Sequence, residues 1–324
     1  MRICIPITFK AQGGGFYFLQ NFESYLEAAG WNILRDVKKP FQVLFTNHWM
    51  TPKNLILKSL RYNPRARIVQ RIDGAAQDYG RFSESDVLQA DVNKLSDLTI
   101  FQSAYARHAT REKFSIISQD GIVIHNPVDT EMFTPEGTKT ALPGQTRIAC
   151  LTWSTNPLKG AAHIYATAKA NPSSHFFLCG NYPDAPDLHN LHNLGVLNRQ
   201  RLAEILRSCH TLLTYSQNEA CPNHVLEALA SGLPVLYKDS GAMSELVGDC
   251  GLPVSVDTFS SQMKRLIRAH KEISIKSRQR ALTRFHPDVV FPQYIQAIEA
   301  ILDQPPNIPA LKRQILAWSG LFNC

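Results

Sequence analysis

The sequence of 324 residues lacks any apolar run that approaches the roughly 18 residues of a membrane span. Its first residues, MRICIPITF, carry one charge and have neither the length nor the small-residue cleavage site of a secretory signal peptide. Tandem repeats and low-complexity tracts are missing as well. We therefore expect a soluble cytoplasmic protein, or one attached only peripherally to the inner face of the membrane.

Paired cysteines are also missing. The 7 cysteines include no CxxC pair, and most stand in apolar surroundings such as RIAC and FFLC. This pattern predicts buried, reduced thiols in place of disulfides. Two short spacings, Cys221-x-x-His224 and His189-x-x-His192, have no partner pair at the distance typical of a zinc site, so we expect no metal ion.

Acidic residues are fewer than basic ones. There are 27 Asp and Glu against 34 Lys and Arg, which gives a formal net charge of +7 and a pI near 9.0. This balance favours polyanionic partners such as nucleotide phosphates, an anionic membrane face or nucleic acid, although a basic enzyme with none of these partners has the same composition. With 44% hydrophobic and 19% charged residues, the chain can bury a full core, and disorder is excluded.

Short apolar segments that are typical of strands alternate with longer segments of helical periodicity. In the first half, helical spacing runs from Phe18 to Ala29 and ends at Gly30, and the strand-like segments are RICIPI, QVLFTN, ARIVQRI, DLTIFQS and GIVIHN. In the second half, predicted helices cover roughly 160–170, 198–208 and the stretch after Asn223, between the strand-like segments TRIACLTW, SHFFLCG, TLLTYS and LPVLYK. This alternation predicts parallel sheets with helices on both faces.

The segment NPVDTEMFTPEGTKTALPGQ, rich in Pro, Gly and Thr, separates the two series and reads as a linker. We predict an α/β protein of two Rossmann-like, doubly wound domains that face a cleft. The domains are an N-terminal Rossmann-like domain at 1–142, a second Rossmann-like domain at 143–287, and C-terminal helices at 288–324 that pack back toward the first domain.

In doubly wound sheets, ligands bind beyond the carboxyl ends of the strands. The unusual residues of this sequence stand at such strand ends, in the segments AQGGG, NHW, RIDG, STNPLKG and SQNEACPN. We therefore expect the functional site to be built from these loops.

Two glutamates stand eight positions apart around the start of a predicted helix. Glu219 lies in the loop after TLLTYS, Asn223 is the predicted N-cap of a helix that begins at His224, and Glu227 lies one turn into that helix. Free N–H groups at a helix start can hold a phosphate, and a carboxylate can accept two hydrogen bonds from a vicinal diol. The arrangement suits a nucleotide sugar, with Glu227 on the ribose and Glu219 on the hexose. The alternative is that both glutamates are solvated surface residues.

A second loop supports the interpretation of this region as a nucleotide-sugar site. In CLTWSTNPLKG, a strand is followed by Lys159 and Gly160 at a helix start, which supplies a cation beside a turn suited to phosphate, unless this lysine is merely solvated.

The chain resembles the retaining glycosyltransferases of family 4, which have the GT-B fold. The resemblance rests on HNPVDTEMF, NPLKG, LGVLNRQRLAEILRSCHTLLTYS and NEACPNHVLEALASGLPVLYKDSGAMSEL, and it covers the second half more densely than the first.

The resemblance implies transfer of a sugar from a nucleoside diphosphate donor with retention at the anomeric carbon, no metal ion, no cofactor beyond the donor, and no enzymatic nucleophile. It places Lys159 on the diphosphate, Glu227 on the ribose and Glu219 on the hexose. The further donor-binding residues that it implies are Gly13, Gly14, Gly15, Ser154, Asn156, Leu197, Asn198, Ala220, Cys221, Pro222, Asn223, His224 and Val225.

Two positions depart from the family pattern. The arginine usually found five or six residues before the diphosphate lysine is replaced by Ser154 or Trp153, so either Arg199, Arg201 or an N-terminal base substitutes, or diphosphate binding is weaker. Asp73, in QRIDG, stands near the place of a family histidine and is a catalytic candidate or a turn residue. His48, in TNHW, is the other catalytic candidate of the first domain, unless it is only structural.

Two basic stretches remain. From Lys53 to Arg71 there are six bases and no acid, which fits either an anionic acceptor or a solvated helix face, and Lys264 to Arg284 reads as a surface helix pair. The leading hypothesis is a hexosyltransferase that extends a surface polysaccharide or another glycan, with a glycan or lipid-linked acceptor and peripheral membrane contact. One alternative is a glycosyltransferase acting on modified bases in DNA, which lacks support from an aromatic-interleaved basic groove. The other is a nucleotide-sugar-binding protein without turnover.

Overall fold

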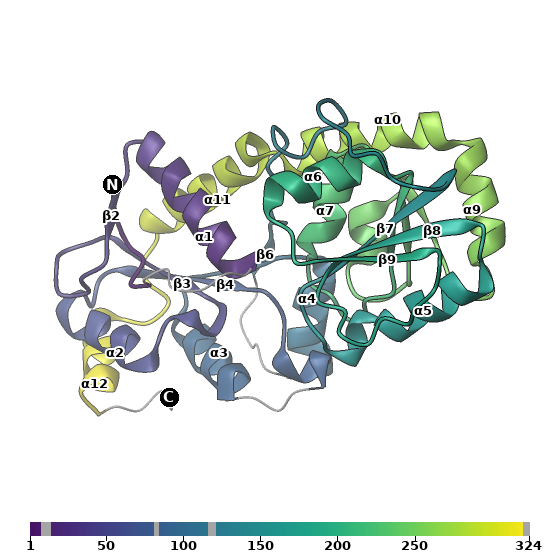
Figure 1. The fold of residues 1–324 in the computed structure, drawn as a ribbon. Coiled ribbons are helices and arrows are strands. Elements are labelled where there is room, and N and C mark those ends of the chain that lie inside the picture. The colour runs from purple at the N-terminus through teal and green to yellow at the C-terminus, as the bar shows by residue number, and fades with distance from the viewer. Residues whose placement is uncertain (8–13, 81–83, 116–120, 320–324) are drawn as a thin grey trace. The chain divides into compact units, whose positions relative to one another are not determined.

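The computed structural model describes residues 1–7, 14–80, 84–115 and 121–319. The chain divides into two compact units, one formed by Met1–Asn126 with Val290–Cys324 and the other by Pro127–Val289. Each unit contains its own sheet, and Figure 1 shows the elements with their labels.

The first unit is built on a parallel sheet of six strands in the order β2-β1-β3-β4-β5-β6. The order reverses between β1 and β3, so the doubly wound topology has its switch point there. The strands are β1 (Arg2–Cys4), β2 (Asn32–Leu34), β3 (Val43–Asn47), β4 (Arg67–Ile72), β5 (Leu98–Phe101) and β6 (Ile122–Val123). Between them lie α1 (Gly14–Ala28), η1 (His48–Met50), α2 (Lys53–Tyr62), η2 (Ala76–Tyr79), α3 (Glu84–Leu95), α4 (Ala104–His108) and the π-helical turn η3 (Ala109–Lys113).

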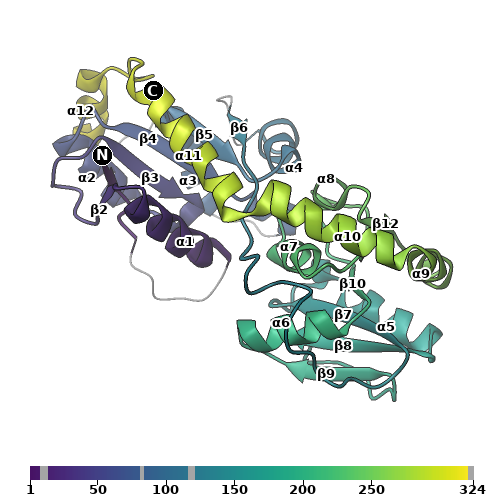
Figure 2. The same ribbon diagram turned by 90° about the horizontal axis from the view of Figure 1, so that it is seen from above.

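Helices cover both faces of this sheet. α1 and α11 (Pro287–Leu302) lie over one face, where Phe22 and Phe291 pack with centroids 5.5 Å apart among buried aliphatic residues of β1, β3 and β4 (Figure 2). α2, α3 and α12 (Ala310–Ser319) cover the other face, where Leu60, Leu95 and Leu316 join one apolar cluster. Val290 and the residues after it therefore complete the core of the first unit.

The second unit is a parallel sheet in the order β12-β11-β10-β7-β8-β9, with its switch point between β7 and β10. Its strands are β7 (Thr146–Thr152), β8 (Ser174–Gly180), β9 (Leu191–Gly195), β10 (Thr211–Thr214), β11 (Val235–Tyr237) and β12 (Gly251–Pro253). Its helices are η4 (Pro157–Lys159), α5 (Ala161–Ala170), α6 (Arg199–Ser208), α7 (Asn223–Ala230), α8 (Met243–Val247), α9 (Phe259–Arg268), α10 (His270–Arg280) and the π-helical turn η5 (Ala281–Phe285).

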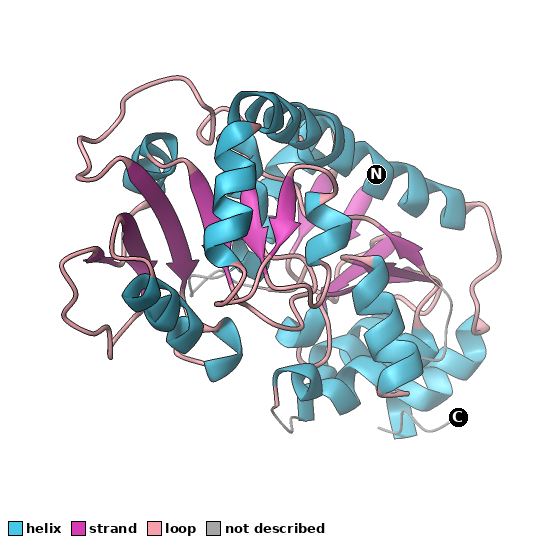
Figure 3. Ribbon diagram, turned by 90° about the vertical axis from the view of Figure 1, so that its right-hand side faces the viewer, coloured by secondary structure: helices cyan, strands magenta, loops and turns pink. Residues whose placement is uncertain are grey.

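Helices flank the strands of the second unit as well (Figure 3). α5 and α9 bury Ile164 and Phe259 against Ile148, Phe176 and Leu213 of the sheet. On the other side, Val225, Leu226 and Leu229 of α7 are fully buried. The near-continuous apolar strands of the sequence are thus buried on both sides, as is usual for parallel sheets.

The predicted α/β class with two Rossmann-like sheets is confirmed, and the predicted helices near 160–170 and 198–208 correspond to α5 and α6. The sequence interpretation missed three short strands, β2, β9 and β12, which have three to five residues each and weak apolar patterns.

The division between the units falls after Asn126, whereas the linker composition suggested a boundary near residue 142. The linker packs on the second unit, because Phe133 is fully buried and Arg278 Nη1 donates to the carbonyls of Thr130 and Phe133, each at 3.0 Å. Proline and glycine therefore mark an ordered surface segment in this part of the chain.

Candidate functional site

The loops that follow β7 and β10 lie together at the switch point of the second sheet. Gln217 N donates to Leu158 O at 2.8 Å, which joins the two loops through their backbones. Gly160 allows this approach: its φ is 78°, and a Cβ at this position would lie 2.5 Å from Tyr215 Cβ. A side chain at residue 160 would therefore both strain the backbone and push the loops apart.

Lys159 Nζ and Glu219 Oε1 form an ion pair across these loops. Their side chains are 22% and 9% exposed, so the pair is largely shielded from water. The backbone of Glu219 is also fixed, because Ala242 N donates to Glu219 O at 2.8 Å and a Cβ at Gly241 would lie 2.5 Å from Glu219 N. The structure therefore brings together two of the predicted catalytic residues.

The start of α7 differs from the prediction by one residue. Asn223 is the first helical residue and Pro222 occupies the N-cap position without a side-chain hydrogen bond, so the predicted Asn223 cap is wrong. Proline suits the cap because its ring holds φ near the observed −70°. Val225 N already donates to Pro222 O at 3.1 Å, in the first turn of the helix.

His224 lies inside the same turn and is uncharged at neutral pH. Its Nε2 is 3.3 Å from Thr214 Oγ1 at the end of β10. Burial lowers the pKa of His224 to about 4, and Lys159 acts in the same direction against the opposing effect of Glu219. The imidazole can therefore offer a neutral hydrogen-bonding group beside the ion pair.

Glu227 lies one turn into α7 and is partly buried. Burial raises the pKa of its carboxyl to about 7, while Arg199 at the start of α6 opposes this shift. Asp129 adds to the rise and lies 4.0 Å from Arg199 between Oδ2 and Nη2. Because this carboxyl ionises near neutral pH, hydrogen bonds from the hydroxyl groups of a ligand would favour its carboxylate form.

Six further predicted donor-binding residues of this unit lie in the loops after β7, β9 and β10. Ser154 and Asn156 follow β7, and Asn156 Oδ1 caps η4 by accepting from Leu158 N at 3.0 Å. Leu197 and Asn198 precede α6, where Asn198 Oδ1 accepts from Arg201 N at 2.8 Å. Ala220 and Cys221 are buried before α7, so they can offer backbone groups more readily than side chains.

The two arginines considered as substitutes for the missing family arginine have different surroundings. Arg201 Nη1 donates to Thr140 Oγ1 at 2.7 Å and to Glu204 Oε2 at 2.5 Å, so it is held by the segment before β7 and by α6 itself. Arg199 is the one whose charge acts on Glu227, and its guanidinium lies 5.2 Å from the centre of the Phe133 ring. Arg199 is therefore the better placed of the two.

In the first unit, His48 and Asp73 meet at the carboxyl ends of β3 and β4. His48 Nδ1 lies 2.5 Å from Asp73 Oδ1 and 2.8 Å from Gln89 Oε1, so Nδ1 faces two acceptors. Burial alone would lower the pKa of His48, but the Asp73 carboxylate outweighs it and the pKa is raised. Conversely, burial would raise the pKa of Asp73, but His48 and Arg71 hold it below its usual value. The pair thus favours imidazolium with carboxylate.

This pair lines a cavity of about 940 Å³ in the first unit. The loop after β4 lines the cavity together with Lys53 of α2 and with α3, which contributes Glu84, Val87 and Asp91. Asp86 of α3 fixes the backbone after this loop, because its carboxylate accepts from Ala76 N at 2.8 Å and from Gln77 N at 3.0 Å. The cavity has the dimensions of a site for a small ligand.

The glycine-rich turn is described only in part. Gly13 lies outside the described residues, while Gly14 and Gly15 open α1 at the switch point of the first sheet. Gly15 O accepts from Asn47 Nδ2 at 3.4 Å, and a Cβ on Gly15 would lie 3.2 Å from Met50 Sδ. A side chain at residue 15 would therefore require Met50 to shift slightly.

Two features of the site were missed because they depend on tertiary contacts. Gln89 and Asp86 act on the His48–Asp73 pair from α3, beyond the strand-end loops. Arg71 was counted with surface bases, yet it is 1% exposed and Nη1 donates to Asn47 Oδ1 at 2.7 Å. The only signal in the sequence was its place within an apolar strand.

The basic stretch from Lys53 to Arg71 does not form one anion-binding face. Arg61 donates to Ala317 O at 2.9 and 2.7 Å, and Arg67 Nε donates to Ile301 O at 3.0 Å. Half of the six bases, Arg61, Arg67 and the buried Arg71, therefore make contacts that stabilise the fold. Among the described residues, no group of three or more His, Cys, Asp or Glu side chains is arranged to hold a metal ion.

Solved structures share this fold along almost the whole chain. Sucrose-phosphate synthase from Thermosynechococcus elongatus aligns with a TM-score of 0.73 at 13% identity, over 93% of this chain and 98% of its own. Anabaena HepE in complex with UDP aligns with a TM-score of 0.71 at 15% identity, over 93% of this chain and 100% of its own. These likenesses identify the GT-B fold of glycosyltransferases.

Sequence comparisons point to the same class. Residues 158–269, which include Lys159, Glu219 and Glu227, match the family model of the glycosyl transferases group 1. The MMP alpha-(1->4)-mannosyltransferase of Mycolicibacterium hassiacum is 26% identical over 208 residues, which are 57% of this chain and 50% of the relative. The GDP-mannose-dependent alpha-mannosyltransferase of Mycolicibacterium smegmatis is 32% identical over 114 residues, 33% of this chain and 30% of the relative.

The chain thus matches half or less of the length of these curated relatives. The GT-B fold implied by the motifs is confirmed, and the part of the chain that carries most of these motifs is similar to glycosyl transferases of group 1. None of the helices in the described part of the chain combines the length and apolar character that a membrane crossing requires.

Proposed function

We propose that the chain is a retaining, metal-independent hexosyltransferase that moves a sugar from a nucleoside diphosphate donor to a glycan or lipid-linked acceptor. The observation that carries the proposal is the Lys159–Glu219 ion pair at the switch point of the second sheet, beside the start of α7. A cation and a carboxylate at that point match the two charged needs of a nucleotide sugar, its diphosphate and its hydroxyls.

In this proposal, Lys159 binds the diphosphate, Glu219 the hexose hydroxyls and Glu227 the ribose. The three donors of the Lys159 ammonium group allow it to contact a phosphate oxygen while it still holds Glu219. The loops around η4 and α7 would supply backbone groups to the phosphates. Gly14 and Gly15, which the sequence motifs also assign to donor binding, open α1 of the first unit.

The reaction requires no nucleophile from the protein. The bond between the anomeric carbon and the phosphate oxygen breaks as the acceptor oxygen bonds to the same face of that carbon. The leaving phosphate oxygen takes the proton of the acceptor hydroxyl. Lys159 and the N-terminus of α7 would stabilise the negative charge that develops on the diphosphate.

The cavity of the first unit is the proposed acceptor site. His48 and Asp73 would orient an acceptor hydroxyl, and Glu84 and Asp91 on α3 suit further hydroxyl groups. These acids in the cavity, together with the structural use of Arg61, Arg67 and Arg71, favour a sugar acceptor over DNA. A lipid-linked acceptor would bring the reaction to the cytoplasmic face of a membrane.

The first test is the melting temperature of the protein against a panel of nucleotide sugars in the presence of a metal chelator. A ligand that binds the folded state must raise the melting temperature, so one donor should produce a selective shift. No shift with any donor would contradict the assigned donor site.

The second test separates an enzyme from a binding protein. Glu219→Gln should keep most of the shift caused by a nucleoside diphosphate, because Lys159 and Glu227 remain, and should lower turnover about a hundredfold or more. Retention is read from the anomeric configuration of the product. If one donor raised the melting temperature selectively but no acceptor gave turnover, the non-catalytic alternative would be favoured. The replacement of the family arginine by Ser154 or Trp153 is compatible with that alternative.

A further inference from the structure

The outer face of α12 is apolar. Leu311, Ile315 and Trp318 are 70%, 59% and 72% exposed. Their spacing of four and three positions places them in one stripe along the helix. A surface helix of a monomeric protein normally turns charged residues to water, so a stripe of three large apolar side chains indicates a contact with something else.

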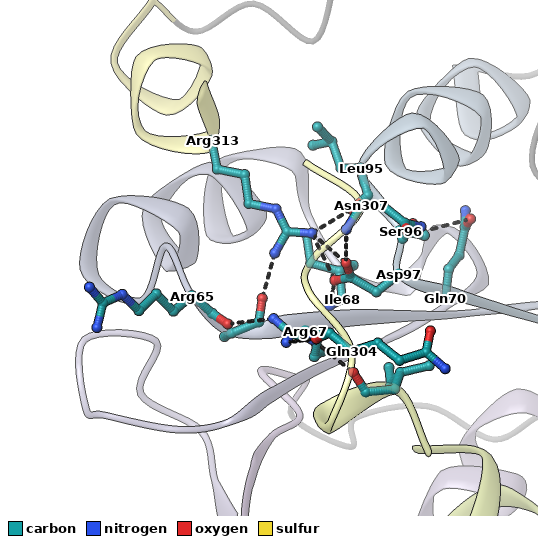
Figure 4. Close-up of polar contacts among 12 residues, drawn as sticks. Arg65, Arg67, Ile68, Gln70, Leu95, Ser96, Asp97, Gln304, Asn307 and Arg313 are labelled. Atoms are coloured by element: carbon teal, nitrogen blue, oxygen red, sulfur yellow. Dashed lines mark hydrogen bonds and ion pairs between the residues drawn. The ribbon is translucent and has the colours of Figure 1, made fainter. Parts of the chain in front are cut away.

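The opposite face of α12 is fixed to the first unit. Arg313, Leu316 and Ala317 are buried against the helices beneath, and Arg313 Nη2 lies 2.7 Å from Asp97 Oδ2 (Figure 4). Arg313 Nη1 also donates to Ala66 O at 2.6 Å. Because this side is locked, α12 cannot rotate to bury the stripe, which stays on the outside.

The helix α2 beside it continues the exposed patch. Tyr62 on α2 is 54% exposed, and the Nζ of Lys38 lies 6.0 Å from the centre of its ring. The guanidinium of Arg61 lies 4.8 Å from the centre of the Trp318 ring while it donates to Ala317 O. Aromatic rings therefore stand next to cations at the edge of the apolar stripe.

The two helices of this face carry charges of one sign. Neither α2 nor α12 contains an acidic residue, and their bases are Lys53, Lys58, Arg61, Lys312 and Arg313. Arg313 and Lys53 are paired with Asp97 and Asp91, which leaves Lys58, Arg61 and Lys312 as the positive charges of these two helices. An apolar face with a basic rim complements a surface that is apolar inside and anionic at its boundary.

We propose that the α12 face, formed by Leu311, Ile315, Trp318 and Tyr62 with its basic rim, docks on an anionic phospholipid bilayer. Tyrosine and tryptophan suit the boundary between headgroups and acyl chains because each combines an apolar ring with a polar group. Lysine stems can lie along the apolar region while their ammonium groups reach the phosphates. The contact is a surface attachment, and it is independent of the proposed transfer reaction.

The test is co-sedimentation of the full chain with vesicles in the absence of any donor. Binding should be strong with vesicles that mix phosphatidylcholine and phosphatidylglycerol, weak with phosphatidylcholine alone, and weaker as salt is raised. The double variant Ile315→Ser, Trp318→Ser should lose at least roughly tenfold in affinity, since both side chains are exposed and contribute by burial in the bilayer. Lys312→Gln should cost roughly fivefold.

A matched control lies in the second unit. Ile275 on α10 is 61% exposed, close to the value for Ile315, so Ile275→Ser should leave vesicle binding unchanged. Equal binding of the double variant and the original protein would overturn the proposal, as would equal binding to both vesicle types. Sedimentation equilibrium without vesicles gives the remaining outcome: a dimer that the double variant abolishes would mean that a second copy covers the face, and the proposal would fail.

Discussion

Lys159 and Glu219, 60 positions apart in the sequence, form an ion pair that is held from both sides by the backbone of adjacent loops. If Lys159 binds the donor diphosphate, Lys159→Met should weaken donor binding by about 1.5–3 kcal/mol, roughly a tenfold to hundredfold rise in Kd. Calorimetric titration with the donor identified in the panel measures this loss. Lys169→Met on the exposed end of α5 is the control and should leave Kd unchanged.

Glu227 should make stability depend on pH in an unusual direction. Its folded-state pKa of about 7 lies above the unfolded value of 4.5, so its contribution is fully present below pH 4.5 and is lost as pH rises through about 7. Glu227→Gln removes this titration and should gain on the order of 3 kcal/mol relative to the original protein between pH 5 and pH 8. Urea unfolding at both pH values measures this difference. If the free energy of unfolding changed equally in both proteins between pH 5 and pH 8, the assigned pKa would be contradicted.

The same titration should appear in donor binding. A carboxylate accepts hydrogen bonds from both ribose hydroxyls, whereas a protonated carboxyl offers fewer acceptors. Affinity should therefore rise from pH 6 to pH 8 more steeply for the original protein than for Glu227→Gln. Titration of the donor phosphates is common to both proteins, so the difference in slope isolates Glu227. Identical slopes would mean that Glu227 does not contact the donor.

Gly160 allows the two donor loops to meet, and its substitution should be costly. Gly160→Ala combines a positive φ with a Cβ placed 2.5 Å from Tyr215 Cβ, so we expect about 3 kcal/mol or more of destabilisation together with weaker donor binding. Gly30 has nearly the same φ, 79°, with no atom within 4 Å of an added Cβ. Gly30→Ala should lose only the backbone term, about 1–2 kcal/mol. Equal losses, measured by urea unfolding, would show that the crowding is relieved elsewhere.

The positions of Lys159, Glu219, His48 and Asp73 could be predicted because parallel strands deliver their following loops to one edge of a sheet. Apolar strands marked those loops clearly, and helical periodicity marked α5, α6 and α7. The sequence alone could not show which side chains of other elements contact these loops.

Gln89 and Arg71 illustrate this limit. Gln89 lies within a helix and contacts His48 only because α3 folds over the end of β3. A guanidinium in a basic stretch looks like a surface group, and only the packing of Asn47, Asn126 and Tyr294 around Arg71 shows that it is buried. The prediction of the Asn223 cap failed for a local reason, because the fixed φ of Pro222 suits the N-cap position and the helix begins at Asn223.

His48 should lose its raised pKa when its partner is removed. In Asp73→Asn, burial remains as the main influence on the imidazole, so the pKa of His48 should fall below its ordinary value. Proton NMR of the histidine ring measures it, with His48→Gln to assign the signal. Asp91→Asn changes another acid that lines the same cavity and should leave the His48 pKa raised. A raised pKa in Asp73→Asn would place the source of the shift elsewhere.

Asp97 fastens the C-terminal helix to the first unit, and its loss should be felt through Arg313. Arg313 is fully buried, its Nη2 lies 2.8 and 2.7 Å from the two oxygens of Asp97, and Asp97 also accepts from Ile68 N and Asn307 N. Asp97→Asn would leave a buried guanidinium without its carboxylate, which should destabilise the protein by about 3–5 kcal/mol. Hydrogen exchange should show the loss first in α12, because this contact fixes its inner face.

The control for Asp97→Asn is the exposed pair of Glu272 and Lys276 on α10, whose side chains are 69% and 43% exposed at a separation of 2.8 Å. Water already solvates both charges there, so Glu272→Gln should leave the melting temperature nearly unchanged. A small effect of Asp97→Asn, similar to that of Glu272→Gln, would mean that the carbonyls of Ala66 and Leu95 suffice to hold Arg313. The docking of α12 would then depend on its apolar contacts with α2 through Leu316.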